Sequence, residues 1–207
     1  MNDIAETMLM RLTRGSGTAG LAAPRPVLKV GDRVHLRPLL TLKKDEIVDV
    51  LRSCGVRWRE DRSNTGRGFF RNRIRHSVLP EWQLAAGRDA LAGAALSREL
   101  LEEDDEALNA WLKSLRPLNR GILHLGCLID LPRALMRRAL RQWLAVQPKA
   151  GELVRQGFED LLTAVLTGNP IRRSLGTHGF AVVRNGRLRF ETARSKKVAK
   201  KRSGKAP

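Results

Sequence analysis

Residues 3–17 read DIAETMLMRLTRGSG, and this segment sets the interpretation of the rest of the chain. Its apolar side chains recur at helical spacing, which predicts a short amphipathic helix over residues 3–14 (Ile4, Met8, Leu9, Leu12). Gly15 is typical of a helix end, and a glycine-rich turn follows it. Because this turn closes a helix, it is not a phosphate-binding loop, which would open one.

Two carboxylates lie in the first turn of this expected helix. Asp3 and Glu6 are three residues apart, so they share one helix face. Acidic residues in a first turn are favoured by the helix dipole, and simple helix capping therefore explains them. The alternative is a carboxylate pair that holds a magnesium ion or the ammonium group of a substrate.

The region up to residue 80 is predicted to alternate helix and strand. We expect strands at residues 34–40 and 56–58, a helix over residues 41–54, and a basic helix over residues 70–79 that Pro80 stops. Two parallel strands do not make a finished α/β domain. The sequence therefore indicates that a preceding segment completes the sheet.

The second half of the chain is expected to be mainly helical. Helical patterns cover residues 85–115, 131–144 and 152–167. Three short strands follow over residues 171–190, and the Asn185-Gly186 pair predicts a tight hairpin between the last two. The fold class is thus a partial α/β domain followed by a helical domain with a small C-terminal antiparallel sheet.

The charge balance indicates a polyanionic partner. Lys and Arg number 39 against 21 Asp and Glu, a net charge of +18. Such a field attracts nucleic acid or an anionic membrane surface. No apolar run reaches the roughly 18 residues of a membrane-spanning helix, and residues 1–6 do not resemble a signal peptide. Cys54 and Cys127 are expected to be reduced thiols in the core of a cytosolic protein, and no feature favours a membrane.

Arginines gather in two places. Seven arginines lie between Arg57 and Arg75, and Arg71 and Arg75 are one helical turn apart, so they could grip one run of phosphates. A solvated basic helix face is the plainer interpretation. Arg11 and Arg14 flank the glycine-rich turn and are available to an anion.

A set of short motifs resembles the tRNA(Ile)-lysidine synthase family of PP-loop ATPases. The motifs occur in order across residues 1–80, and weaker similarity continues to about residue 192: Asp3-x-x-Glu6-Thr7, Leu9-x-Arg11-Leu12-x-Arg14-Gly15-Ser16-Gly17-x-x-Gly20-Leu21, Arg37-Pro38-Leu39-Leu40, Asp45-Glu46-Ile47, Glu60-Asp61-x-Ser63-Asn64 and Arg71-Asn72-x-Ile74-Arg75.

The resemblance implies an ATP-dependent ligase with the PP-loop fold. Such an enzyme adenylates C2 of the wobble cytidine in the CAU anticodon of tRNA(Ile), and the amine of lysine then displaces AMP. ATP and Mg²⁺ would be the cofactors, and tRNA(Ile) and L-lysine the substrates. A homodimer is left open.

The resemblance also implies site residues. Asp3 and Glu6 would meet the magnesium ion or the lysine, with Asp3 as the metal ligand. Arg71 would be the catalytic arginine that neutralises developing negative charge. Further residues would bind tRNA: Arg11, Arg14, Arg37, Asn72 and Arg75. The implied domains are residues 1–82 (C-terminal part of the catalytic domain), 83–96 (linker helix), 97–192 (helical tRNA-binding domain) and 193–207 (basic disordered tail).

The sequence departs from the family pattern in two ways. The family motif His-x-x-Asp-Asp-x-x-Glu-Thr has Asn2 in place of its first Asp here, and the ATP-binding Ser-Gly-Gly-x-Asp-Ser loop does not occur in the sequence. We therefore expect an N-terminally truncated member whose 207 residues alone make no lysidine. The alternatives are a catalytically silent tRNA-binding module and a tRNA thiolase; the thiolase is disfavoured because cysteine clusters are missing.

Overall fold

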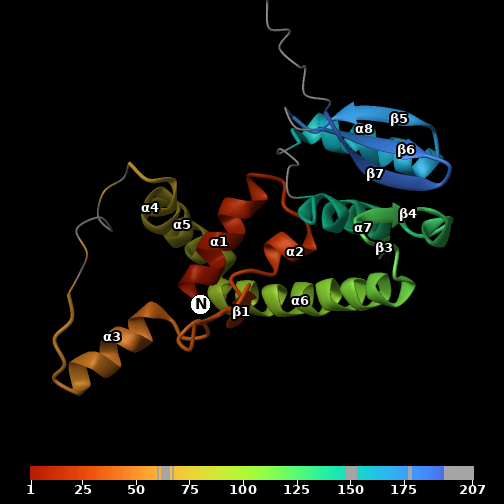
Figure 1. Cartoon of the computed structure of the whole chain (residues 1–207). Coiled ribbons are helices and arrows are strands. Elements are labelled where there is room, and N and C mark those ends of the chain that lie inside the picture. The colour runs from red at the N-terminus through yellow and green to blue at the C-terminus, as the bar shows by residue number, and fades with distance from the viewer. Residues whose placement is uncertain (60, 62–65, 67, 148–152, 177–178, 194–207) are drawn as a thin grey trace, which may run out of the picture. The chain divides into compact units, whose positions relative to one another are not determined.

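The computed structural model describes residues 1–59, 61, 66, 68–147, 153–176 and 179–193, and it divides into two compact units (Figure 1). The first unit comprises Met1–Ala107 and the second Leu108–Pro207. Each unit has its own hydrophobic core. The C-terminal sheet belongs to the second unit, and the expected site residues belong to the first.

The first unit is mainly helical. Its elements, coloured red to yellow-green in Figure 1, follow in the order α1 (Asn2–Leu12), α2 (Thr18–Leu21), β1 (Val27–Val30), β2 (Arg33–Leu36), α3 (Lys44–Ser53), α4 (Phe70–Arg73), a π-helical segment (Ile74–Val78), α5 (Leu79–Ala86) and the start of α6 (Ala90–Leu115).

Helix α1 forms as the sequence predicts, and it carries much of the first core. Ile4 and Ala5 are almost fully buried, and they cluster with Ile74 and Leu79 from the π-helical segment and α5. After the helix ends, Gly15 adopts φ +69°, a left-handed conformation that a glycine tolerates without strain. The chain can therefore turn sharply into α2.

Three predictions for the first unit are wrong. The expected strand at residues 34–40 is shorter, because β2 spans Arg33–Leu36 and pairs antiparallel with β1 in a hairpin. Residues 56–58 form no strand, so the expected parallel pair does not exist. Pro80 does not stop its helix either, since it lies in the first turn of α5, where a missing N–H costs nothing.

The second unit packs helices against one face of a sheet. Helices α7 (Arg133–Ala145) and α8 (Arg155–Thr167) accompany five antiparallel strands in the order β3-β4-β7-β6-β5. The strands are β3 (Leu118–Asn119), β4 (Ile122–His124), β5 (Ile171–Ser174), β6 (Gly179–Arg184) and β7 (Arg187–Thr192). A 3₁₀ turn at Gly126–Leu128 lies between β4 and α7.

Alternation along the strands fixes which face is buried. Leu123, Ala181, Val183 and Leu188 are at most 1% exposed and join the core made by α7 and α8. Trp143 of α7 is fully buried in the same core, and its Nε1 donates a hydrogen bond to the carbonyl of Gly121 at 2.8 Å. One face of the sheet is thus buried in the hydrophobic core against α7 and α8.

The expected fold class is confirmed, although β3 and β4 were not foreseen. Asn185 and Gly186 both have positive φ, so the tight hairpin between β6 and β7 is confirmed. Parts of other predictions lie outside the described residues: the motif residues Glu60, Ser63 and Asn64, the helix start at residue 152 and the tail from residue 194. No helix in the described ranges is long and apolar enough to cross a membrane.

Candidate active site

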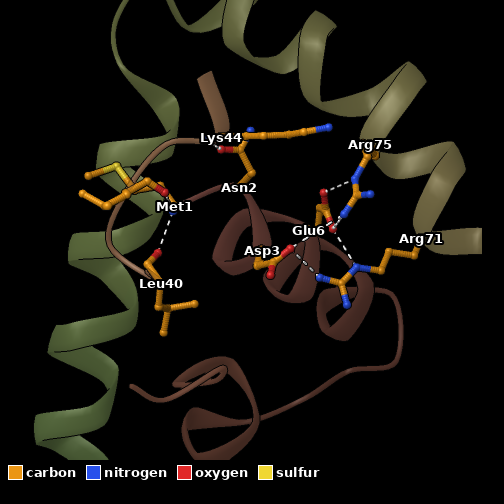
Figure 2. Close-up of polar contacts among 9 residues, drawn as sticks. Met1, Asn2, Asp3, Glu6, Leu40, Lys44, Arg71 and Arg75 are labelled. Atoms are coloured by element: carbon orange, nitrogen blue, oxygen red, sulfur yellow. Dashed lines mark hydrogen bonds and ion pairs between the residues drawn. The ribbon is translucent and has the colours of Figure 1, made fainter. Parts of the chain in front are cut away.

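The first site feature is a carboxylate excluded from solvent under two arginines. The Glu6 side chain is 0% exposed, and it accepts hydrogen bonds of 2.6 Å from Nε of Arg71 and 2.6 Å from Nε of Arg75. A further 3.0 Å bond comes from Nη2 of Arg75. Figure 2 shows both guanidinium groups converging on this carboxylate. Both oxygens of Glu6 are therefore occupied by the protein itself.

Asp3 lies beside this cluster but remains open to solvent. Its side chain is 59% exposed, and Oδ1 accepts a 2.8 Å bond from Nη2 of Arg71. Arg75 approaches the same oxygen at 3.7 Å. The sequence prediction that Asp3 and Glu6 share a helix face is confirmed. Because Glu6 is buried and Asp3 is exposed, only Asp3 can contact a ligand.

The hydrogen bonds to Glu6 and Asp3 favour the charged form of Arg75 and fix the orientation of the guanidinium groups of Arg71 and Arg75. The hydrogen bond to Glu6 is the main reason that the pKa of Arg75 is raised above its ordinary value. Arg71 uses Nε for Glu6 and Nη2 for Asp3, so Nη1 is left without a partner among the described residues. An oriented guanidinium with one unengaged edge is suited to bind an anion.

The local helix geometry brings both arginines to one carboxylate. Arg71 lies in α4, and Arg75 lies in the π-helical segment that directly follows it. Wider π turns occur most often as short insertions at functional sites. Ile74, between the two arginines, is 3% exposed and anchors the segment in the core. The two polar side chains can therefore point away from that core toward α1.

The start of α1 is tied to the first turn of α3. The backbone N–H of Lys44 donates a 3.0 Å hydrogen bond to the side-chain oxygen of Asn2 (Figure 2). This bond satisfies an N–H at the first turn of α3 that has no partner within the helix. Asn2, which departs from the family motif, thus accepts a hydrogen bond as an aspartate would.

A cavity opens on the exposed side of the cluster. It has a volume of about 320 Å³, and its lining combines four arginines with one carboxylate: Asp3, Thr7, Met10, Arg11, Arg14, Pro24, Arg37 and Arg71. Arg11 is fixed by a hydrogen bond from Nη1 to the carbonyl of Gly20, and Arg37 by a 3.2 Å bond to the carbonyl of Arg25. The lining is therefore strongly basic and partly preorganised.

The structure brings some expected site residues together and places others elsewhere. Asp3, Arg11, Arg14, Arg37 and Arg71 line the cavity. Glu6 and Arg75 are not part of this lining, and Glu6 binds Arg71. Asn72 is 6% exposed, and its amide donates a 2.7 Å bond to the carbonyl of Gly66, away from the cavity lining.

Three lining residues were missed in the sequence. Thr7 and Met10 continue the helical face that Asp3 and Arg11 define, since they lie four and seven residues after Asp3. This helical spacing is the sequence feature that could have identified Thr7 and Met10 as lining residues. Pro24 carried no comparable signal, because it comes from the segment after α2.

The described side chains do not make a magnesium site by themselves. No group of three or more His, Cys, Asp or Glu residues in the described ranges could hold a metal ion. Glu6 does not fit, because arginines occupy both of its oxygens. Asp3 fits the common arrangement in which Mg²⁺ takes one or two carboxylates together with substrate phosphates and water.

Several known proteins are similar to this chain over most of its length. Residues 1–82 match the model of the PP-loop domain family. The chain is 37% identical over 183 residues to a tRNA(Ile)-lysidine synthase from Geobacter sulfurreducens, and 34% identical over 200 residues to one from Symbiobacterium thermophilum. Over most of its length, the chain is therefore similar to tRNA(Ile)-lysidine synthases. A tRNA(Ile)-lysidine synthase from Solibacter usitatus is 54% identical over 85 residues, which is 41% of this chain and 18% of that protein.

The matches cover most of this chain but less than half of the relatives. The aligned part is 83% of this chain and 38% of the Geobacter protein, and 90% of this chain and 40% of the Symbiobacterium protein. The chain thus spans about two fifths of the length of these curated relatives.

Proposed function

We propose that this chain carries part of the active site of a tRNA(Ile)-lysidine synthase, which ligates lysine to C2 of the wobble cytidine in the CAU anticodon through an adenylated intermediate. The observation that carries the proposal is the arginine-lined cavity beside Asp3 and Arg71, with Glu6 buried beneath them. We also propose residues 1–82 as catalytic domain, 83–96 as linker and 97–192 as tRNA-binding domain.

The chemistry of the cavity favours phosphate over the lysine side chain. Four arginines face one carboxylate across the lining, so a cationic ammonium group would be repelled by most of its surroundings. Phosphate oxygens instead match the guanidinium donors of Arg11, Arg37 and Arg71. The proposal therefore places a phosphate of ATP or of tRNA in the cavity.

The proposed roles follow from burial. Arg71 is the catalytic arginine, since its unengaged Nη1 can meet the charge that develops as cytidine is adenylated. Glu6 is a positioning residue, because it binds Arg71 and does not line the cavity, and Arg75 in turn binds Glu6. Asp3 is the candidate ligand for the metal. ATP would supply the activating group, and Mg²⁺ would neutralise its phosphates.

The test compares tRNA binding at equilibrium. The purified chain is titrated with a tRNA(Ile) transcript that has a CAU anticodon, and with the same transcript carrying a different wobble base. The proposal expects tighter binding of the CAU transcript, and a loss of that preference in Arg37→Gln and Arg71→Gln. Equal affinity for both transcripts would refute anticodon recognition by this chain.

A further inference from the structure

The second unit has an exposed sheet face that the proposed catalytic site does not use. Alternation along β5, β6 and β7 sends one set of side chains into the core and the other outward. We define the outer sheet face by its outward residues, which are mostly arginines: Arg172, Phe180, Val182, Arg184, Arg187, Arg189 and Glu191. Its four arginines are all exposed.

The arginines nearest the β6–β7 turn repel one another. Arg184 and Arg187 are direct cross-strand partners on either side of the Asn185-Gly186 turn. Like charges directly opposite one another destabilise a sheet. Neither side chain has an acidic partner in the described part of the chain, and Arg187 pairs on its other side with His124 of β4. An anionic ligand would relieve this repulsion.

Other arginines of the same unit are neutralised internally. Arg133 and Arg137 bind Glu159 at 2.9 and 2.5 Å, and Arg173 binds Asp160 at 2.7 Å. Glu159 and Asp160 thus neutralise arginines on the helix-covered side of the sheet. The outer sheet face is left with an excess of positive charge. Only Glu191 contributes an acid there among its defined residues, at 2.9 Å from Arg189 and 3.8 Å from Arg172.

One of these arginines is held in place on the face. The guanidinium carbon of Arg172 lies 3.4 Å from the centroid of the Phe180 ring, which is cation–π contact. Arg187 and Arg189 are two residues apart on β7, about 6.8 Å at the usual rise of an antiparallel strand. A row of arginines on a rigid sheet suits successive phosphates along a polynucleotide strand.

We propose that the outer sheet face is a docking surface for the phosphate backbone of an RNA, gripped by Arg184, Arg187 and Arg189. A membrane surface is less suited, because no large apolar side chain of β5, β6 or β7 is among the exposed ones. That the bound polynucleotide is RNA rests on the function proposed above. That the outer sheet face binds phosphate groups does not depend on that function.

The test is the salt dependence of RNA binding by the full chain. The double variant Arg184→Gln/Arg187→Gln should bind a tRNA transcript about tenfold more weakly near 0.1 M salt, and its log–log salt slope should fall by about 1–2. The matched control is Arg133→Gln/Arg137→Gln, which removes the same charge from internally paired arginines. Its affinity should stay within about threefold of the original, because these arginines already bind Glu159.

The outcomes separate this inference from the proposed function. Loss of affinity in the double variant alone, with unchanged thermal unfolding, supports the docking surface even if all tRNAs bind equally. Equal losses in both variants, or none in the first, would overturn it while leaving any CAU preference intact. Binding to phosphatidylserine vesicles without binding to tRNA would also overturn it.

Discussion

Arg71 donates a 2.6 Å hydrogen bond through Nε to Oε2 of Glu6, a residue 65 positions earlier that is itself fully buried. This contact joins α1 to α4 and points the remaining edge of Arg71 toward the cavity that Asp3 also lines. Because the buried carboxylate cannot reach a ligand, its effect on a substrate must pass through the arginines.

Glu6 and Asp3 should differ sharply in their contributions to stability. Glu6→Gln leaves two guanidinium groups without a buried counter-charge, and we expect a loss of about 1–3 kcal/mol in the free energy of unfolding. Asp3→Asn breaks only an exposed pair and should cost less than about 1 kcal/mol. Urea unfolding of both variants measures the difference. Equal costs would show that the burial of Glu6 has no energetic consequence.

Gly20 should resist substitution because of Ser16. A Cβ at Gly20 would lie 2.8 Å from Cβ of Ser16, so Gly20→Ala should destabilise the chain by about 1–2 kcal/mol. It should also weaken anion binding, since Nη1 of Arg11 donates to the carbonyl of Gly20. The double variant Ser16→Gly/Gly20→Ala removes the clash and should recover most of both losses. If the double variant is no more stable, the close contact is not the cause.

Gly179 should be the least replaceable glycine of the sheet. A Cβ there would meet Cζ of Phe190 at 2.3 Å and the backbone oxygen of Glu191 at 2.5 Å. Gly179→Ala should therefore cost about 2–3 kcal/mol in unfolding experiments. Gly126→Ala is the control, because nothing lies within 4 Å of its Cβ position. Similar melting temperatures for the two variants would contradict the packing between β6 and β7.

Glu159 should make stability depend on pH. Its hydrogen bond with Arg137, and then that with Arg133, lowers the pKa of the Glu159 carboxyl below its ordinary value. The stabilisation is therefore complete above the ordinary glutamate pKa of about 4.3 and is lost as pH falls through the lower folded value.

The comparison that isolates this effect is Glu159→Gln against the original chain. The difference in urea midpoint should be constant from about pH 7 to pH 5 and should shrink below about pH 4. Glu103→Gln, at an exposed position of α6, removes the same charge and is the matched control. A difference for Glu159→Gln that is the same at every pH would count against the ion pairs.

Local patterns predicted the helices well because each carries its own periodic signal. The face shared by Asp3 and Glu6 followed from helical spacing alone. The short strands β3 and β4 span two and three residues, too few for an alternating pattern to show. Residues 56–58 have strand-forming side chains but no neighbouring strand to pair with, so tertiary context overrode their preference.

The site was harder to predict, since its parts are distant in sequence. Spacing could not show that Arg71 and Arg75 close over Glu6, because no local rule joins residues so far apart. The family resemblance predicted Arg71 as a site residue. It did not predict that Glu6 is buried whereas Asp3 is exposed. Asn72 was expected to face the substrate, and only the fold shows that its amide binds a backbone carbonyl.

The most direct test of the central claim is lysine ligation by a chimera. In it, the matched 183-residue region of the Geobacter relative is replaced by the corresponding residues of this chain. The account predicts ATP-dependent incorporation of lysine into tRNA(Ile) with a CAU anticodon, and a loss of at least about 10²-fold in Arg71→Ala with the fold intact. A folded chimera that incorporates no lysine, or one in which Arg71→Ala ligates at the unsubstituted rate, would contradict it.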